Sequence, residues 1–265
     1  MSQRPLDQPD PLDDFTHRQI TLLGETRRVY VMGSGPAVIV MTEMPGISPH
    51  VARFARWVRD AEFTVYLPHL FGKDGATLSS WYAVSTIARA CVSRQFKAFA
   101  ANDSSPITKW LRALAAQAHD ECGGKGVGAI GMCFTGNFAL SMMLEPAVLA
   151  PVLAQPSLPL GKPGGMHIAP AELAAVKARM EAEDLTVKAY RFEGDSFCKA
   201  ERFAAYAEAL GDRFEGTVLP DSAANPNTPY KNPHSVVTLH LIDEAGQPTA
   251  IARDEILDFF RMRLI

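Results

Sequence analysis

Cys133 is the side chain with the clearest potential for nucleophilic chemistry in this sequence. It stands in the run GAIGMCFTG, residues 128–136, which predicts a strand, a sharp turn that carries the thiol, and an apolar helix. Such a turn strains the backbone at the nucleophile, so neighbouring residues must be small. Gly131, Thr135 and Gly136 meet this need, although Thr135 is larger than the usual glycine. The free N–H groups of a helix that begins after the thiol favour a thiolate and stabilise an oxyanion.

Two further residues complete a nucleophile, acid and base in chain order. Asp195 follows an expected strand at 185–192, and His234 lies on a loop rich in Asn and Pro after another expected strand at 214–219. Enzymes with this type of turn carry their acid and histidine in that order, on loops at the carboxyl ends of later strands. Cys133, Asp195 and His234 are therefore the candidate catalytic residues.

Each of these residues also has a purely structural interpretation. The run around Cys133 fits a buried cysteine with glycines for packing. Asp195 fits the N-cap of a helix that begins near Phe197, and it could serve both roles. His234 fits an exposed loop histidine, and His240 is the rival base, although it lies inside the β-branched run 236–242. The remaining histidines have no comparable placement: His17, His50, His69, His119 and His167.

Short apolar runs alternate with helical patterns along the chain, which predicts an α/β fold. Strands are expected at 19–23, 27–32, 37–42, 63–67, 127–131, 148–154, 185–192 and 214–219. Helices are expected around 51–58, after Ser105-Pro106, and at 134–144, 170–180, 198–210 and 249–264. This alternation of strands and helices predicts a fold of three layers, with a mostly parallel central sheet and helices on both faces. We expect a flexible tail at 1–14 and a single domain over 15–265, since no linker divides the chain.

Five stretches of the chain resemble the dienelactone hydrolases, a family of carboxymethylenebutenolidase-like α/β-hydrolases. They are AVIVMTEMPGI, FTVYLPHLFG, GAIGMCFTGNFAL, RFEGD and NPHSV, which together with the last helix cover most of residues 37–264. A cysteine nucleophile is itself discriminating, because most enzymes with this turn use serine. The resemblance implies an α/β-hydrolase fold with Cys133 as nucleophile, Asp195 as acid and His234 as base.

The resemblance also implies roles that the residues alone do not. Glu43 matches the family's glutamate beside the thiol, which competes for the cysteine proton and releases the thiolate when substrate binds. The backbone N–H groups of Met44 and Phe134 match its oxyanion hole. Taken by itself, Glu43 fits equally well a surface residue or the cap of the helix that starts near Pro49.

The chain departs from the family pattern in three places. Thr135 replaces the glycine of the best-known members, and the N-terminal tail and the loop 155–169 are longer than a minimal member needs. The arginines that bind the substrate carboxylate in dienelactone hydrolase have no clear counterpart. Arg89 and Arg94 are the candidates, and they also fit charges on a solvated helix face.

Composition and charge limit the function classes further. Of 265 residues, 47% are hydrophobic and 21% are charged, as in soluble globular chains. A net charge of −3 provides no overall attraction for nucleic acid or for anionic membranes. The polar N-terminus lacks the apolar segment of a secretory signal, and no apolar run approaches the roughly 20 residues of a membrane span. Four dispersed cysteines, Cys91, Cys122, Cys133 and Cys198, suit a reducing compartment, so a cytoplasmic location is expected.

These observations predict a cysteine hydrolase that acts on a small-molecule ester or lactone through a thioester intermediate. No cofactor or metal is expected, because the sequence has no GxGxxG, no P-loop and no cluster with metal-ligand spacing. Other acyl chemistry on the same fold is the closest alternative, namely a thioesterase, a peptidase or an acyltransferase. A non-catalytic homologue that binds a partner is the alternative from a different class, and Thr135 is the feature that favours it.

Overall fold

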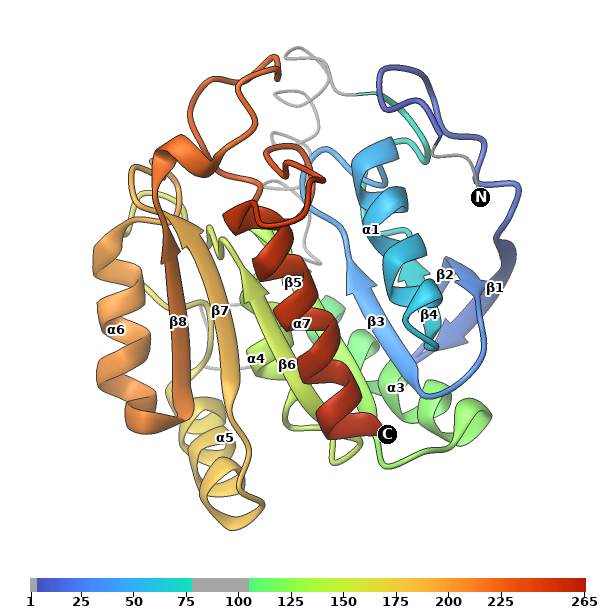
Figure 1. Ribbon diagram of the computed structural model, residues 1–265. Coiled ribbons are helices and arrows are strands. Elements are labelled where there is room, and N and C mark those ends of the chain that lie inside the picture. Colours follow the sequence, from blue (N-terminus) through green and yellow to red (C-terminus); the bar gives the residue numbers. More distant parts are fainter. Residues whose placement is uncertain (1–3, 78–104) are drawn as a thin grey trace.

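The computed structural model describes residues 4–77 and 105–265, and within these ranges eight strands form one sheet (Figure 1). Their order across the sheet is β1-β2-β4-β3-β5-β6-β7-β8. The strands are β1 (Thr16–Leu22), β2 (Glu25–Met32), β3 (Ala37–Met41), β4 (Thr64–Pro68), β5 (Val127–Met132), β6 (Val148–Ala154), β7 (Val187–Phe192) and β8 (Phe214–Leu219). The hairpin β1–β2 is antiparallel and joins β4 antiparallel, whereas the pairs from β4 to β8 are parallel.

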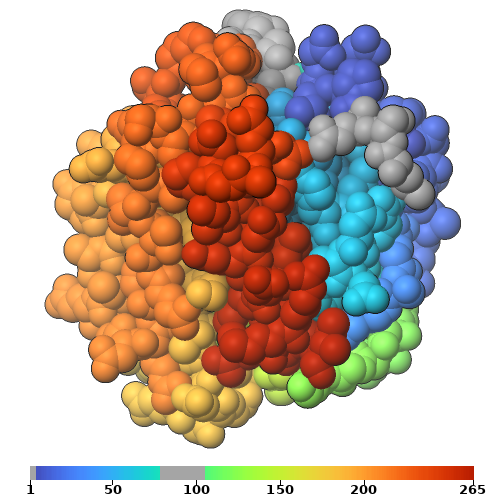
Figure 2. All heavy atoms as spheres, in the orientation of Figure 1, coloured from blue at the N-terminus to red at the C-terminus, as the bar shows by residue number. Residues whose placement is uncertain are grey.

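Helices cover both faces of the sheet. On one face lie α1 (Pro49–Asp60) and α7 (Pro248–Leu264), which stand side by side in the space-filling view (Figure 2). The helices on the opposite face are α3 (Pro106–Cys122), α4 (Phe138–Met142), α5 (Pro170–Ala182) and α6 (Ala200–Leu210). The expected three-layer α/β-hydrolase fold with a mostly parallel sheet is therefore confirmed.

The apolar run at β3 explains how the central layer forms. Every residue of β3 is fully buried, and alternate side chains enter the two cores. Ile39 and Met41 pack beneath α3 and α4, whereas Val38 and Val40 pack beneath α1 and α7. Because side chains alternate across a strand, a continuous apolar run is what a strand needs when both of its faces are covered.

Two predicted helix signals are present. Ser105 is the N-cap of α3, with its hydroxyl accepting the N–H of Thr108, and Pro106 occupies the first turn, where its missing N–H costs nothing. Gly211 follows α6 with φ of +57°, a left-handed conformation that glycine adopts without steric cost.

Two segments differ from the sequence-based expectation. The helix expected over 134–144 is divided into a 3₁₀ turn, η1 (Cys133–Thr135), and the short α4, because the chain turns sharply at its start. The run 236–242 contains Val and Thr but forms successive turns, in which the N–H of His240 donates to the carbonyl of Ser235. Burial between the loop and α7, rather than strand pairing, accounts for its apolar side chains.

The segment before β1, which we expected to be a flexible tail, packs against α1 from residue 10 onward. Asp10 and Leu12 are buried, and the guanidinium of Arg56 binds the carboxylates of Asp10 and Asp14 at 2.6 to 3.0 Å. The N–H of Asp10 also donates to the carbonyl of Gly75. These contacts join the segment to the loop that follows β4.

The parallel strands β3, β5, β6 and β7 all end at the same edge of the sheet (Figure 1). The loops that contain Glu43, Cys133, Gln155 and Asp195 start there, which brings distant parts of the sequence together. None of the helices in the described ranges is long and apolar enough to cross a membrane.

Candidate active site

Cys133 occupies a strained turn directly after β5. Its φ is +53°, in the left-handed region that residues other than glycine seldom enter. Holding such a residue there costs about 1–3 kcal/mol, so the surrounding structure must impose the conformation. The side chain is partly exposed, while the carbonyl accepts the N–H groups of Gly136 and Ser157 at 3.0 and 2.9 Å. These features are those of a nucleophile presented on an elbow.

The small residues around the thiol have a direct steric cause. A Cβ on Gly131 would lie 2.1 Å from the carbonyl oxygen of Thr135, and one on Gly136 would lie 2.6 Å from the Cα of Pro156. Both distances are far below van der Waals contact. Glycine is therefore required on each side of Cys133 for the turn to close.

Thr135 occupies its place without steric or polar conflict. Its side chain is fully buried, and its hydroxyl accepts the N–H of Met132 at 3.0 Å. The same hydroxyl has the carbonyl oxygens of Met41, Thr42 and Met132 within 3.1 to 3.2 Å as acceptors for its proton. Thr135 thus connects the elbow to the carboxyl end of β3, a contact that glycine could not make.

His234 and Asp195 form a hydrogen-bonded pair, with 2.7 Å between Nδ1 of the imidazole and Oδ2 of the carboxylate. The Asp195 side chain is completely buried, and that of His234 is 14% exposed. The other oxygen of Asp195 accepts the backbone N–H groups of Phe197 and Cys198 at 2.8 and 2.9 Å. Asp195 therefore holds the turn before α6 and orients His234, whereas the N-cap of α6 is Lys199 and not Asp195.

The pKa of His234 is raised well above its usual value. Burial would lower it, but the negative charge of Cys133 and the hydrogen bond to Asp195 outweigh that effect and favour the imidazolium. Within the described ranges, Nε2 of His234 is buried and has no hydrogen-bond partner, and Cys133 is the neighbour whose charge raises the pKa of the ring. The structure thus brings Cys133, His234 and Asp195 together.

His240, the rival base, has a different position. Its Nδ1 accepts the backbone N–H groups of His234 and Ser235 at 3.3 and 3.1 Å, so its proton resides on Nε2, which donates to the carbonyl of Tyr230. Burial lowers the pKa of His240, which keeps the ring neutral. His240 holds the loop that carries His234 and is not directed at the thiol.

Glu43 lies at the end of β3 and is buried, and Ser48 rather than Glu43 is the N-cap of α1. One carboxyl oxygen accepts the hydroxyl of Thr238 at 2.5 Å, and the other accepts the side-chain amide of Gln155 at 3.3 Å. Burial raises the pKa of Glu43, and these hydrogen bonds and the charge of His234 oppose the rise only in part. Glu43 therefore retains its proton to higher pH than an exposed glutamate does.

Gln155 and Thr238 are site residues that the sequence reasoning missed. Gln155 follows β6, is fully buried with φ of +36°, and accepts the N–H of Val236 on its side-chain oxygen. It thus connects Glu43 to the loop of His234. The position of Gln155 at the carboxyl end of a central strand was an available signal, whereas Thr238 lies within an apolar run that gave none.

Met44 and Phe134 lie where the resemblance requires oxyanion donors. Met44 follows Glu43 at the end of β3, and Phe134 follows Cys133 in the first turn after β5. Both pack against the same core cluster as Cys133, and the Phe134 ring contacts Phe71 edge to face at 6.0 Å. Their role as donors stays a prediction.

A cavity of about 240 Å³ adjoins this group. It is lined by Ser157, Leu160, Gly161, Lys162, Pro163, Ser196, Phe197, Lys199 and Arg202. The Phe197 ring contacts the His234 ring at 5.3 Å, and Ser157 donates its N–H to the carbonyl of Cys133. Arg202 is buried and donates to the carbonyls of Leu158, Pro159 and Lys162, which fixes part of the loop 155–169. Arg89 and Arg94 lie outside the described residues.

Comparison with known proteins gives a family and a set of similar folds. The model of the dienelactone hydrolase family matches residues 25–215. Among curated proteins the comparison finds no significant match. A Klebsiella pneumoniae protein assigned as a dienelactone hydrolase is 16% identical, with a TM-score of 0.63 over 93% of this chain and 98% of its own.

Two proteins from metagenomic libraries have similar folds. A dienelactone hydrolase-like promiscuous phosphotriesterase is 18% identical, with a TM-score of 0.61 over 95% of this chain and 100% of its own. A cold-adapted esterase from an Arctic intertidal library is 11% identical, with a TM-score of 0.60 over the full length of both chains. At these identities the likeness shows the fold alone.

Proposed function

The chain belongs to the dienelactone hydrolase family, and from that premise we propose that it hydrolyses a small carboxylic ester or lactone through Cys133, His234 and Asp195. Family membership makes it a hydrolase of small molecules. The bond that it cleaves and the group that attacks are our inference. One observation carries the proposal: a thiol on a positive-φ elbow faces a histidine that is hydrogen-bonded to a buried aspartate.

The first half of the reaction forms a thioester. His234, oriented by Asp195, takes the thiol proton of Cys133, and the thiolate attacks the carbonyl carbon. The N–H groups of Met44 and Phe134 would stabilise the oxyanion. Removal of one such donor typically lowers kcat by about 10²–10³-fold. The tetrahedral adduct collapses, the C–O bond breaks, and His234 returns the proton to the alkoxide that leaves.

The second half regenerates the thiol. His234 takes a proton from a water molecule, and the hydroxide attacks the thioester carbonyl at the same oxyanion site. The C–S bond breaks, the carboxylic acid is released, and the proton on His234 returns to Cys133. For a lactone the alcohol and the acid are two ends of one product.

Glu43 has a separate place in this proposal. Its raised pKa and its hydrogen bonds to Thr238 and Gln155 make it a buried acid on the same set of loops. We infer that Glu43 competes for the proton of Cys133 in the resting enzyme, as the family resemblance implies. The hydrogen bond from Thr238 then controls how readily the carboxyl can turn toward the thiol.

No observation favours the non-catalytic alternative, because Thr135, the feature that suggested it, is accommodated by four polar atoms around its hydroxyl. The related alternatives are a thioesterase, a peptidase and an acyltransferase. Thioesters, peptides and acyl acceptors other than water, tested as substrates, distinguish them from an esterase.

The direct test compares hydrolysis of p-nitrophenyl acetate and of unsaturated lactones by the wild type, Cys133→Ala and Cys122→Ala. Cys122 is a free, half-buried thiol at the end of α3 and serves as the matched control. We expect Cys133→Ala to lose activity by about 10⁴-fold or more, and Cys122→Ala to retain it. Equal activity of Cys133→Ala and the wild type would refute the proposal.

A further inference from the structure

The segment before β1, residues 4–15, is joined to α1 by a buried ion pair. The guanidinium of Arg56 binds both carboxylate oxygens of Asp10, at 2.6 and 3.0 Å, and both of Asp14, at 2.8 Å. The Asp10 side chain is 1% exposed and that of Arg56 is 13% exposed. A pair in which both oxygens are bound is geometrically specific, and removal of one partner leaves the other charge buried and uncompensated.

Apolar packing holds the same segment in place. Leu12 and Phe15 are buried in the core cluster that also contains Ile47 and the inner face of α1. The guanidinium of Arg56 lies over the Phe15 ring, 5.5 Å from its centre. The segment before β1 is thus part of a close-packed core, and its ion pair has a fixed position relative to α1.

Backbone hydrogen bonds connect this ion pair to a loop of the candidate active site. The N–H of Asp10 donates to the carbonyl of Gly75, in the loop after β4, at 2.8 Å. The N–H of Gly75 donates in turn to the carbonyl of Ile47, in the loop after β3, at 2.7 Å. Ile47 is fully buried and follows Met44 by three residues. A series of hydrogen bonds therefore runs from the Arg56 side chain to the loop that carries Met44.

The segments in this series are packed too closely to shift independently. A Cβ on Gly75 would lie 1.9 Å from the carbonyl oxygen of Asp10, and one on Gly46 would lie 2.6 Å from the carbonyl oxygen of Phe71. The Phe71 ring also contacts that of Phe134 edge to face. The loop after β4 thus contacts both of the segments in which we expect oxyanion donors.

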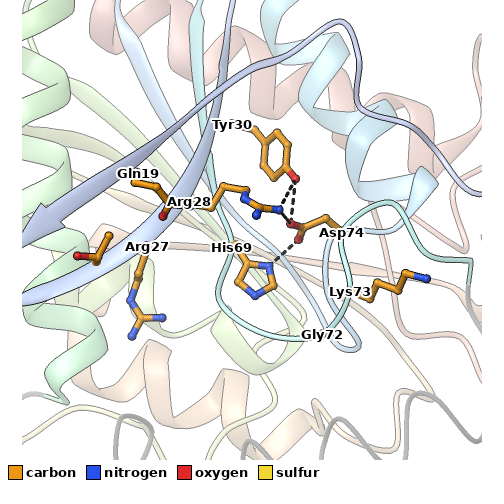
Figure 3. Close-up of a pocket in the computed structure, with 9 residues that line it drawn as sticks. Gln19, Arg27, Arg28, Tyr30, His69, Gly72, Lys73 and Asp74 are labelled. Carbon is orange, nitrogen blue, oxygen red and sulfur yellow. Dashed lines mark hydrogen bonds and ion pairs between the residues drawn. The ribbon is translucent and has the colours of Figure 1, made fainter.

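The loop after β4 has a second anchor, which attaches it to the sheet. The carboxylate of Asp74 lies 2.6 Å from Nδ1 of His69 and accepts the hydroxyl of Tyr30 at 2.9 Å (Figure 3). Among the described residues, these three line a polar pocket between the β1–β2 hairpin and the loop. Asp74 therefore fixes the loop relative to β2, whereas Gly75 fixes it relative to the residues that follow β3.

We propose that Asp10 and Arg56 are positioning residues for the oxyanion site, and that they act through Gly75 on the loop that carries Met44. The inference rests on the proposed function, because it concerns an oxyanion donor of that reaction. Such a donor stabilises the transition state only while its N–H stays within hydrogen-bond distance of the developing charge. A displacement of about 1 Å, caused far from the reacting atoms, can lower the rate about 10²-fold. The segment before β1 thereby contributes to the reaction without contacting the substrate.

The test compares two reactions of Cys133, of which only one requires an oxyanion site. Hydrolysis of p-nitrophenyl acetate forms an oxyanion, whereas in alkylation by iodoacetamide the thiolate displaces iodide at a saturated carbon. In Asp10→Asn and Arg56→Gln we expect kcat for the ester to fall by about tenfold or more. The rate of alkylation at Cys133, measured by peptide mass spectrometry, should stay close to that of the wild type.

The variants are chosen to separate positioning from folding. Asp14 still compensates Arg56 in Asp10→Asn, and Arg56→Lys keeps the positive charge and should recover part of the kcat that Arg56→Gln loses. Asp13→Asn is the matched control, because Asp13 is 67% exposed and pairs with Arg4 in the same segment. The control should hydrolyse the ester as the wild type does. All rates are measured well below the unfolding midpoint of each variant, so that they refer to folded protein.

Two outcomes would overturn the proposal. One is that folded Asp10→Asn and Arg56→Gln hydrolyse the ester at the rate of the wild type. The other is that alkylation slows in proportion to kcat, which would place the effect on the thiol rather than on the oxyanion site. Failure of the proposed function is recognised separately, because Cys133→Ala would then hydrolyse the ester as the wild type does.

Discussion

The described residues contain two His–Asp pairs with nearly the same hydrogen bond and very different surroundings. His234 and Asp195 are joined at 2.7 Å, and His69 and Asp74 at 2.6 Å. The Asp195 side chain is fully buried and its His234 partner is 14% exposed, whereas Asp74 is 11% and His69 is 35% exposed. The hydrogen bond alone therefore does not distinguish the pair that we propose to be catalytic from the other pair.

What differs is the group across the imidazole. His234 faces a thiol on a strained elbow, and the charge of that thiol raises the pKa of the ring. His69 faces a pocket lined by arginine and lysine, where no described nucleophile is present. In our proposal the first pair orients a base, whereas the second pair lies in the contact between the loop after β4 and Tyr30 of β2.

The largest expected effect comes from removing the carboxylate of each pair in turn. Asp195→Asn should lower kcat for ester hydrolysis by about 10⁴-fold, because the amide no longer holds the imidazole in the tautomer that accepts the thiol proton. Asp74→Asn should change it less than about twofold. Steady-state kinetics on p-nitrophenyl acetate measure both, and similar losses in the two variants would remove the distinction between the pairs.

The next largest effect is expected from a substitution at the elbow, which should lower the free energy of unfolding. Thr135→Val keeps the shape of the side chain but leaves the N–H of Met132 without its acceptor, so the free energy of unfolding should fall by about 1–3 kcal/mol. Thr135→Ser keeps the hydroxyl and should lose less. Urea unfolding of the two variants provides the comparison, and an equal loss would show that the hydroxyl does not matter.

The pKa of His234 should fall when the thiol is removed. In Cys133→Ala the negative charge that most favours the imidazolium is absent, so the ring should release its proton at lower pH than in the wild type. Titration of the histidine ring signals by NMR measures this. His50, whose pKa burial lowers to about 4, is the internal reference that stays neutral across the range. An unchanged or higher pKa of His234 would contradict the pairing.

The smallest effect concerns the cavity beside His234. Phe197 is 55% exposed and packs its ring against the imidazole, so Phe197→Ala should raise KM for aryl esters by less than about tenfold and leave kcat nearly unchanged. Leu23→Ala, at the exposed turn of the β1–β2 hairpin, is the control. A fall in kcat with constant KM would place Phe197 in the positioning of His234 rather than in substrate binding.

Much of the fold could be predicted because its signals are local. Continuous apolar runs identified β3, β5 and β6, and residues such as Ser105 and Gly211 identified helix ends. The division of 134–144 was not predicted, because it depends on how the elbow closes against β3 and residue 156. Hydrophobic periodicity contains no information on such a contact.

The candidate site also has a part that local sequence signals predict and a part that depends on contacts between distant residues. Cys133, Asp195 and His234 could be named as candidates because each stands beside a recognisable strand end, in an order typical of the fold. The hydrogen bond from Thr238 to Glu43 joins residues far apart in the sequence and was invisible before the loops were placed. The hydrogen bond between His69 and Asp74 was also not predicted, although these two residues are close in sequence. Whether two side chains of one loop pair depends on the conformation of that loop.

The most direct test of the central claim is to trap the acyl group on the enzyme. Wild type and Cys133→Ala are mixed with p-nitrophenyl acetate, quenched with acid within the first turnovers, and digested for peptide mass spectrometry. Our account predicts an acetyl group on the peptide that contains Cys133 in the wild type and none on the corresponding peptide of the variant. Hydrolysis by the wild type with acetyl groups only on other residues, or with none at all, would contradict it.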